Sequence, residues 1–185
     1  MHRKEGFTLK RIDIGFRLSV CAALLAAVAA VSQEPGSTPA APVPAAIRTA
    51  KKIFVSNGGA DSGLFPSPFS GDPSRGYLQL YAGLKQTGQY DLVDDPAAAD
   101  LVLELQLTAP NGPTNGSKMN GASDPVPMFR LAIYDRKTHY VLWTLTQSIP
   151  IALFQKSHDR NFDDALTAIL RQFVELSSKA PNAGP

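Results

Sequence analysis

Leucine at every second position from 101 to 107 constrains the fold more than any other feature of this sequence. The positions between these leucines hold Val102, Glu104 and Gln106. A period of two is typical of a β-strand that has one face on the core and the other face half polar. The chain therefore contains a strand whose leucine face needs a covering layer.

Further strands are predicted on both sides of this one. Residues 52–57 (KIFVSN) form a β-branched and aromatic run that ends at Asn57-Gly58-Gly59, and residues 90–93 form a brief strand before Asp95-Pro96. One helical turn is expected at 97–99. Alternating apolar residues at 129–133 and 141–145, joined by a turn at 135–139, predict a β-hairpin.

Two amphipathic helices are predicted to cover the sheet. Asp72-Pro73 offers a cap and a first-turn proline, and Gly88 is a natural end for the first helix. Its apolar stripe is Tyr77, Leu80, Tyr81 and Leu84. Asn161 is expected to cap the second helix, with Asp163 and Asp164 at the positive end of its dipole. The apolar positions of that helix are Phe162, Leu166, Ile169, Leu170, Phe173 and Leu176.

These elements predict an α/β (α+β) fold: a two-layer sandwich with a mixed four- to five-stranded sheet and two helices packed on one face. The other face of the sheet is either solvated or available to a partner. It is expected to carry Val102, Glu104, Gln106, Arg130, Ala132, Tyr134, Leu142, Thr144 and Thr146.

The amino-terminal quarter has the composition of an export leader followed by a linker. Basic residues from Arg3 to Arg17 precede a 14-residue apolar run, Leu18 to Val31, which is shorter than the roughly 20 residues of a spanning helix. We expect a signal peptide at 1–30, a Pro/Ala-rich disordered tether at 31–47, a single domain at 48–179 and a disordered tail at 180–185. The alternative is an uncleaved leader that holds the chain in the membrane. Otherwise the chain is expected to be periplasmic or extracellular.

Charge and cysteine content exclude several functions. The leader carries five Lys and Arg against two Asp and Glu, so thirteen basic and fourteen acidic residues remain from position 34 onward. A near-neutral chain lacks the positive field that nucleic acid binding requires. The single cysteine, Cys21, lies inside the apolar run with Arg17 upstream, which makes a poor lipoprotein site. No cofactor and no metal are expected, since only two histidines and no thiol follow the leader.

Two segments carry a resemblance to known proteins. Residues 99–105 (ADLVLEL) and 134–143 (YDRKTHYVLW), followed by an amphipathic helix, resemble secreted and periplasmic accessory domains. This group includes the amino-terminal domain of TolB, CsgG-like proteins and related uncharacterised bacterial lipoproteins. His139 stands where the turn of that group usually has Gly. The resemblance implies an envelope protein that contacts other proteins and is not an enzyme.

No catalytic motif is present. The strings G-x-S-x-G, G-x-x-x-x-G-K-[ST] and H-E-x-x-H are absent. The leading hypothesis is therefore a non-catalytic envelope module that binds a protein partner through the open sheet face or the two long loops. Its possible binding residues are Phe65, Phe69, Arg130, Tyr134 and Thr144.

Two alternatives remain at this stage. One is a small hydrolase or sugar-binding enzyme that uses His139, His158 and a loop Asp as general acid and base, which requires these groups to share one pocket. The other is a spacer domain without a specific partner.

Overall fold

A five-stranded mixed sheet organises the part of the chain that the computed structural model describes, residues 41–110 and 125–178. The strands are β1 (Lys52–Ala60), β2 (Asp91–Leu92), β3 (Leu101–Thr108), β4 (Met128–Asp135) and β5 (Val141–Ser148). Their order across the sheet is β2-β1-β3-β4-β5. β1 is parallel to both of its neighbours, β2 and β3, whereas β4 is antiparallel to both of its neighbours, β3 and β5.

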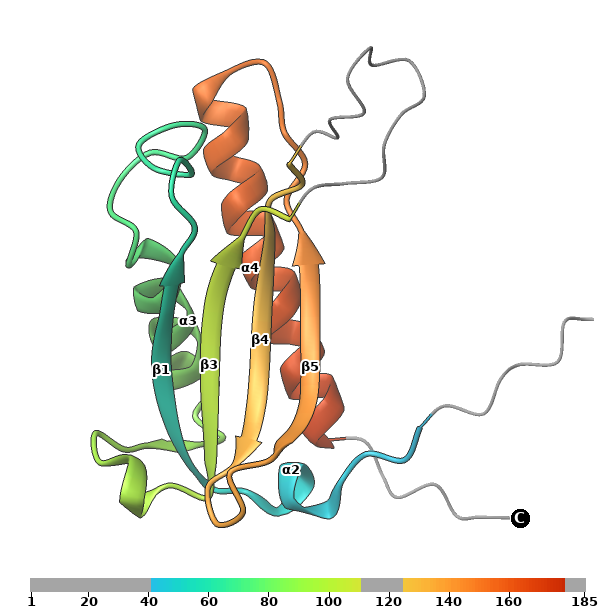
Figure 1. Ribbon diagram of the computed structural model, residues 1–185. Coiled ribbons are helices and arrows are strands. Elements are labelled where there is room, and N and C mark those ends of the chain that lie inside the picture. The colour runs from blue at the N-terminus through green and yellow to red at the C-terminus, as the bar shows by residue number, and fades with distance from the viewer. Residues whose placement is uncertain (1–40, 111–124, 179–185) are drawn as a thin grey trace, which may run out of the picture. The chain divides into compact units, whose positions relative to one another are not determined.

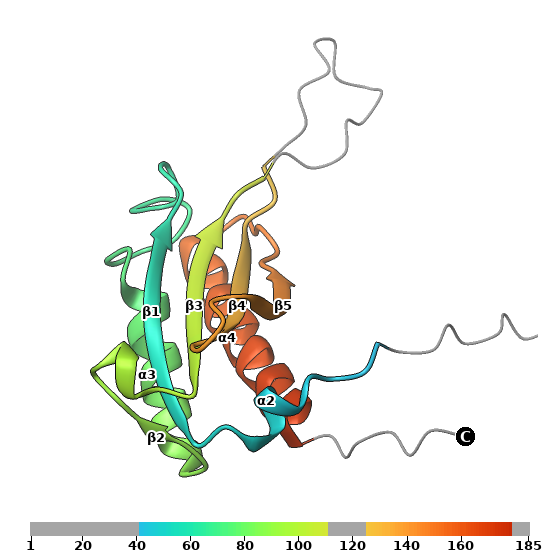
Figure 2. The same ribbon diagram turned by 60° about the horizontal axis from the view of Figure 1, so that its bottom comes forward.

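Two long helices, α3 (Arg75–Thr87) and α4 (Gln155–Ser178), pack on the same face of this sheet (Figures 1 and 2). The short helix α2 (Ala45–Thr49) and the 3₁₀ turn η2 (Pro96–Ala98) complete the described elements. The predicted two-layer α+β arrangement is confirmed. The predicted leader, most of the tether, residues 111–124 of the second loop and the tail at 180–185 lie outside the described residues.

The alternating leucines of β3 are buried on one face of the sheet, as their period of two predicts. Leu101, Leu103, Leu105 and Leu107 are at most 4 % exposed, while the residues between them are half-buried on the other face. The helices bring large apolar side chains onto this row, which are Leu80 and Leu84 from α3 and Phe162, Ile169 and Phe173 from α4. The hydrophobic effect of this one shared layer holds sheet and helices together.

Helix α3 ends where predicted, but the expectation that Asp72 caps it and Pro73 is its first residue is wrong, since the N-cap is Ser74. It starts at Arg75, two residues after Pro73, and Asp72 accepts a hydrogen bond from the Ser74 N–H at 2.7 Å just before it. Gly88 ends the helix in the left-handed conformation, with φ of 63°, where a glycine pays no steric penalty. The predicted stop is confirmed.

Helix α4 is longer than predicted, and the expectation that Asn161 caps it is wrong. The helix begins at Gln155, six residues earlier, and the Asn161 side-chain amide donates to the Pro150 carbonyl at 2.8 Å. Residues 155–160 carry no apolar periodicity, so the sequence pattern does not reveal this first turn. Asp163 consequently lies inside the helix, where Arg75 and not the helix dipole accounts for it.

Two boundaries also differ from the prediction. The last residues of the predicted tether are ordered, since α2 begins at Ala45 and Ile47 is fully buried in the core. In β5, a bulge next to the pair Ile133 and Trp143 shifts the register. Leu142 therefore packs against the core and does not belong to the open face.

Candidate functional site

Three of the predicted binding residues lie on the sheet face that the helices leave uncovered. Arg130 and Tyr134 are on β4, and Thr144 on β5 is paired with Ala132 between them. Residues four apart on one strand are separated by about 13 Å. The register thus places the three side chains on one face within a span that a single partner segment can cover.

The other two predicted binding residues lie in the first loop. Phe69 is fully buried, and Phe65 packs on Phe69 and Phe162 with ring centroids 6.2 Å away in each case. Burial of both rings against α4 is favoured by the apolar area that it removes from water. Phe69 is therefore part of the core and is wrong as an exposed anchor, whereas Phe65 is half-buried and its role in binding stays a prediction.

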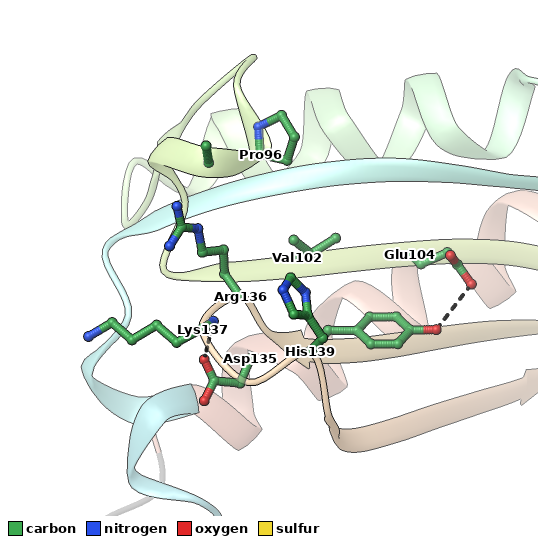
Figure 3. A pocket seen from close by; sticks show the side chains of 9 residues that line it. Pro96, Val102, Glu104, Asp135, Arg136, Lys137 and His139 are labelled. Atoms are coloured by element: carbon green, nitrogen blue, oxygen red, sulfur yellow. Dashed lines mark hydrogen bonds between the residues drawn. The ribbon is translucent and has the colours of Figure 1, made fainter.

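A pocket of about 680 Å³ opens on the uncovered face, at the end of the sheet where β4 turns into β5 (Figure 3). Tyr134 and Val102 contribute apolar surface from neighbouring strands, and Pro96 and Ala97 of η2 form one wall. The turn after β4 forms the opposite wall with Asp135, Arg136, Lys137 and His139. Of the predicted binding residues only Tyr134 lines this pocket, beside Glu104.

The turn is held in shape by Asp135. Its Oδ1 accepts the Lys137 N–H at 2.8 Å, and its backbone carbonyl accepts the His139 N–H at 2.8 Å. The Lys137 N–H is also the main reason that the pKa of Asp135 lies below its ordinary value. His139 has φ of 61°, as its place in a turn that usually takes glycine predicts. The turn thus has fixed geometry, and Arg136 and Lys137 project from it.

A second carboxylate ties this turn to the start of the sheet. Asp100 Oδ2 accepts the N–H groups of Lys51 and Lys52 at 2.9 Å each, which lower its pKa. The Asp100 carbonyl accepts the Arg136 N–H at 3.4 Å. The second residue of the resemblance segment 99–105 is therefore an Asp whose structural role is to join β1, β3 and the hairpin turn.

The carboxylates of the pocket are already engaged by groups of the chain itself. The Tyr134 hydroxyl donates to Glu104 Oε1 at 3.4 Å, drawn as a dashed line in Figure 3. The Asp135 carboxylate accepts the backbone N–H of Lys137 in the turn. Both hydrogen bonds come from neutral groups, so Glu104 and Asp135 are acidic members of the pocket, and Arg136 and Lys137 are its basic members, beside the apolar surface of Tyr134 and Val102. The sequence reasoning did not single out this basic pair, although its place in a tight turn between two strands was visible.

The two histidines do not form a common site. The alternative hypothesis of a hydrolase or sugar-binding enzyme that uses both His139 and His158 is therefore wrong. His139 lies before β5 and His158 lies in the first turn of α4, after it. The eight residues of β5 span about 25 Å, and Figure 1 shows the hairpin turn and the start of α4 at opposite ends of the sheet. General acid and base chemistry needs groups within hydrogen-bond reach of one substrate.

His158 itself is part of the packing between the first loop and α4. Its Nε2 contacts the Ala152 carbonyl, and its ring meets Phe69 edge-on with 6.5 Å between centroids. Its Nδ1 is buried and has no hydrogen-bond partner among the described residues. His158 is half-buried, and these contacts are those of a side chain that packs between the first loop and α4.

A polar network that the sequence did not predict joins the first loop and α3 to α4. Arg75 donates to Asp159 at 2.9 Å and to Asp163 at 2.6 Å, and its guanidinium lies 4.6 Å from the centre of the Phe162 ring. Ser70 donates to Asp159 from both its N–H and its hydroxyl. Burial opposes ionisation of Asp159, but the hydrogen bonds from Ser70, Arg75 and Gln155 outweigh it and hold its pKa at about 2. The network fixes the loop in place.

Across residues 41–110 and 125–178 there is no group of three or more His, Cys, Asp or Glu side chains that could hold a metal ion. None of the helices in those ranges has both the length and the apolar composition that a membrane crossing requires.

Comparison with known proteins assigns no family. No protein-family model matches the sequence, and no curated protein matches it. The structure is similar to a PelC dodecamer subunit from Paraburkholderia phytofirmans, with a TM-score of 0.43 and 15 % identity, over 76 % of this chain and 95 % of that one.

Two further similar structures come from other bacteria. A DUF4136 family protein from Bacteroides thetaiotaomicron has a TM-score of 0.46 and 13 % identity, over 72 % of this chain and 92 % of that one. The uncharacterised lipoprotein B from Nitrosomonas europaea has a TM-score of 0.37 and 13 % identity, over 70 % and 85 %. None of these three is TolB or CsgG, and the resemblance to those two proteins stays a prediction. At such low similarity, function has to be argued from the chain's own residues.

Proposed function

We propose that this chain is a non-catalytic, exported module of the cell envelope that binds another protein through the open face of its sheet. The observation that carries the proposal is the pocket of about 680 Å³ beside Tyr134, on the face that α3 and α4 leave uncovered. Its floor includes the apolar surface of Tyr134 and Val102, its walls are turns, and its lining holds two basic side chains, Arg136 and Lys137, beside two acidic ones, Glu104 and Asp135. A site of this kind suits a partner that places one apolar side chain in the pocket and makes polar contacts around it.

The pocket chemistry favours a partner segment that carries an acidic side chain next to an apolar one. Tyr134 and Val102 provide the apolar contact, and Arg136 and Lys137 provide the charge. Arg130 and Thr144 extend the surface along β4 and β5. The export leader predicted at 1–30 supports a periplasmic or extracellular location, and the TolB-like and CsgG-like pattern of 134–143 supports the same assignment.

Site-specific photo-crosslinking tests this proposal in the organism that makes the protein. A photoreactive phenylalanine analogue replaces Tyr134 in one strain and Leu78, an exposed residue of α3, in a control strain. We expect a crosslinked protein from position 134 and not from position 78, because the two residues lie on opposite layers. Loss of the product with Arg136→Glu, and its retention with Arg171→Glu on α4, would show that the basic side chains of the pocket take part.

The result against the proposal is equally definite. Equal crosslinks from positions 134 and 78, or none from 134 while the protein is present and folded, would remove the open face as the binding surface. A crosslinked product from position 134 that forms equally well with Arg136→Glu would rule out a partner segment with an acidic side chain.

A further inference from the structure

The two edges of the sheet differ in how they are protected. The β2 edge is two residues long and is followed by Asp94, Asp95 and Pro96, features that discourage another strand from pairing. The β5 edge is eight residues long, contains no charged residue and no proline, and among the described residues pairs only with β4. Unpaired backbone groups on such a strand are a template for another strand.

Exposed apolar side chains gather at both ends of this edge strand. The described residues include six large hydrophobic side chains that are exposed, and five of them flank β5. Tyr140 and Val141, at its start, are 75 % and 48 % exposed. Ile151, Leu153 and Phe154, in the connection to α4 after its end, are 53 %, 94 % and 72 % exposed. Apolar surface concentrated in this way marks an interaction site.

We propose that β5 pairs antiparallel with β5 of a second copy of this chain, around a two-fold axis. Antiparallel pairing sets the start of one strand beside the end of the other, so the cluster at Tyr140 and Val141 meets the cluster at Ile151 to Phe154 of the second copy, and the reverse contact forms as well. This reciprocity is what a two-fold interface requires. No charged side chain of β5 itself opposes the second copy, and the nearest charge across the sheet from Thr146 is Arg130 on β4.

The proposed pairing has a register that can be tested. A register with Thr146 opposite its own equivalent pairs residues 144–148 of the two β5 strands and brings Val141 beside Ile151 of the second copy, which lies beyond the end of β5 and after Pro150. Thr146 is exposed and lies on β5 away from the pocket. Like charges directly opposite each other across strands are unfavourable, and opposite charges are favourable. Position 146 therefore reports on self-pairing.

The test measures mass in solution by light scattering during gel filtration, on the full chain as its host processes it. We expect a concentration-dependent dimer for the natural sequence, and a dissociation constant raised about tenfold or more in Thr146→Lys and in Thr146→Glu. An equimolar mixture of these two variants should restore the dimer. Thr167→Lys, the same change on an exposed position of α4, should leave the mass unchanged.

A covalent variant covers the case in which the charged ones fold poorly. Thr146→Cys, in a chain with Cys21 changed to Ser, should form a disulfide-linked dimer under mild oxidation, and Thr167→Cys should not. A natural protein that is monomeric at about 100 µM, where a specific dimer is expected to form, would overturn the proposal. So would a mixture of Lys and Glu variants that stays monomeric, or crosslinking at position 167 equal to that at position 146.

Discussion

The Asp159 carboxylate gives the sharpest quantitative prediction for the stability of this domain. Its side chain is 22 % exposed and accepts hydrogen bonds from Ser70, Arg75 and Gln155. A pKa lowered from 3.8 to about 2 corresponds to about 2 kcal/mol of folding free energy, because each pKa unit is worth about 1.4 kcal/mol. Asp159→Asn should therefore lower the free energy of unfolding at pH 7 by about 2 kcal/mol, measured by urea denaturation.

The pH dependence follows from the direction of this shift. The folded state prefers the ionised carboxylate, so the contribution is fully present above the unfolded pKa of 3.8 and is lost as pH falls through the folded value of about 2. The difference in unfolding free energy between the natural protein and Asp159→Asn should stay constant from pH 7 to about pH 5 and shrink below about pH 4.

A matched control separates this network from ordinary surface pairs. Glu175 is 3.7 Å from Arg171, and both side chains are about 70 % exposed, at 69 % and 72 %. Glu175→Gln should cost less than about 0.5 kcal/mol, since solvent screens the pair. Equal losses in the two variants, or a loss in Asp159→Asn that does not change between pH 7 and pH 3, would refute the reasoning.

Three further substitutions test the packing, each by urea denaturation. Gly76→Ala should destabilise by about 1 kcal/mol although alanine favours helices, because its Cβ would lie 3.1 Å from Cε1 of the buried Phe129 ring; a gain in stability would contradict this. His139→Gly should stabilise by about 0.5 kcal/mol by removing the cost of φ at 61°, and a loss would show that the imidazole contributes more than the strain. Phe162→Ala should cost about 3 to 5 kcal/mol, whereas Phe154→Ala, 72 % exposed, should change stability by less than about 0.5 kcal/mol; similar costs would contradict the assigned core.

Local patterns predicted the elements of the fold where one physical cause dominates. The leucine alternation of β3, the hairpin of β4 and β5, and the end of α3 at Gly88 all follow from burial period or backbone preference. The first turn of α4 could not be predicted in this way. Its polar residues, among them Asp159, are ordered by partners such as Ser70, which lies 89 positions away.

The candidate site shows the same division between local and long-range causes. Tyr134, Arg130 and Thr144 were found because side chains alternate across a strand, and period alone assigns their face. Phe69 was misplaced because a loop has no period, so the sequence does not say whether its aromatic rings point outward or into the core. The basic pair at 136–137 gained a role only when the turn was placed opposite η2.

By itself the sequence determined which residues alternate, where the backbone must turn and which stripes must be covered, because these depend on neighbours within a few positions. Only the tertiary structure decided that Arg75 meets Asp159 and Asp163, that the two histidines lie at opposite ends of β5, and that β5 is an unprotected edge. These facts depend on the order of strands and on contacts between distant segments, which arise when the whole apolar layer is buried at once.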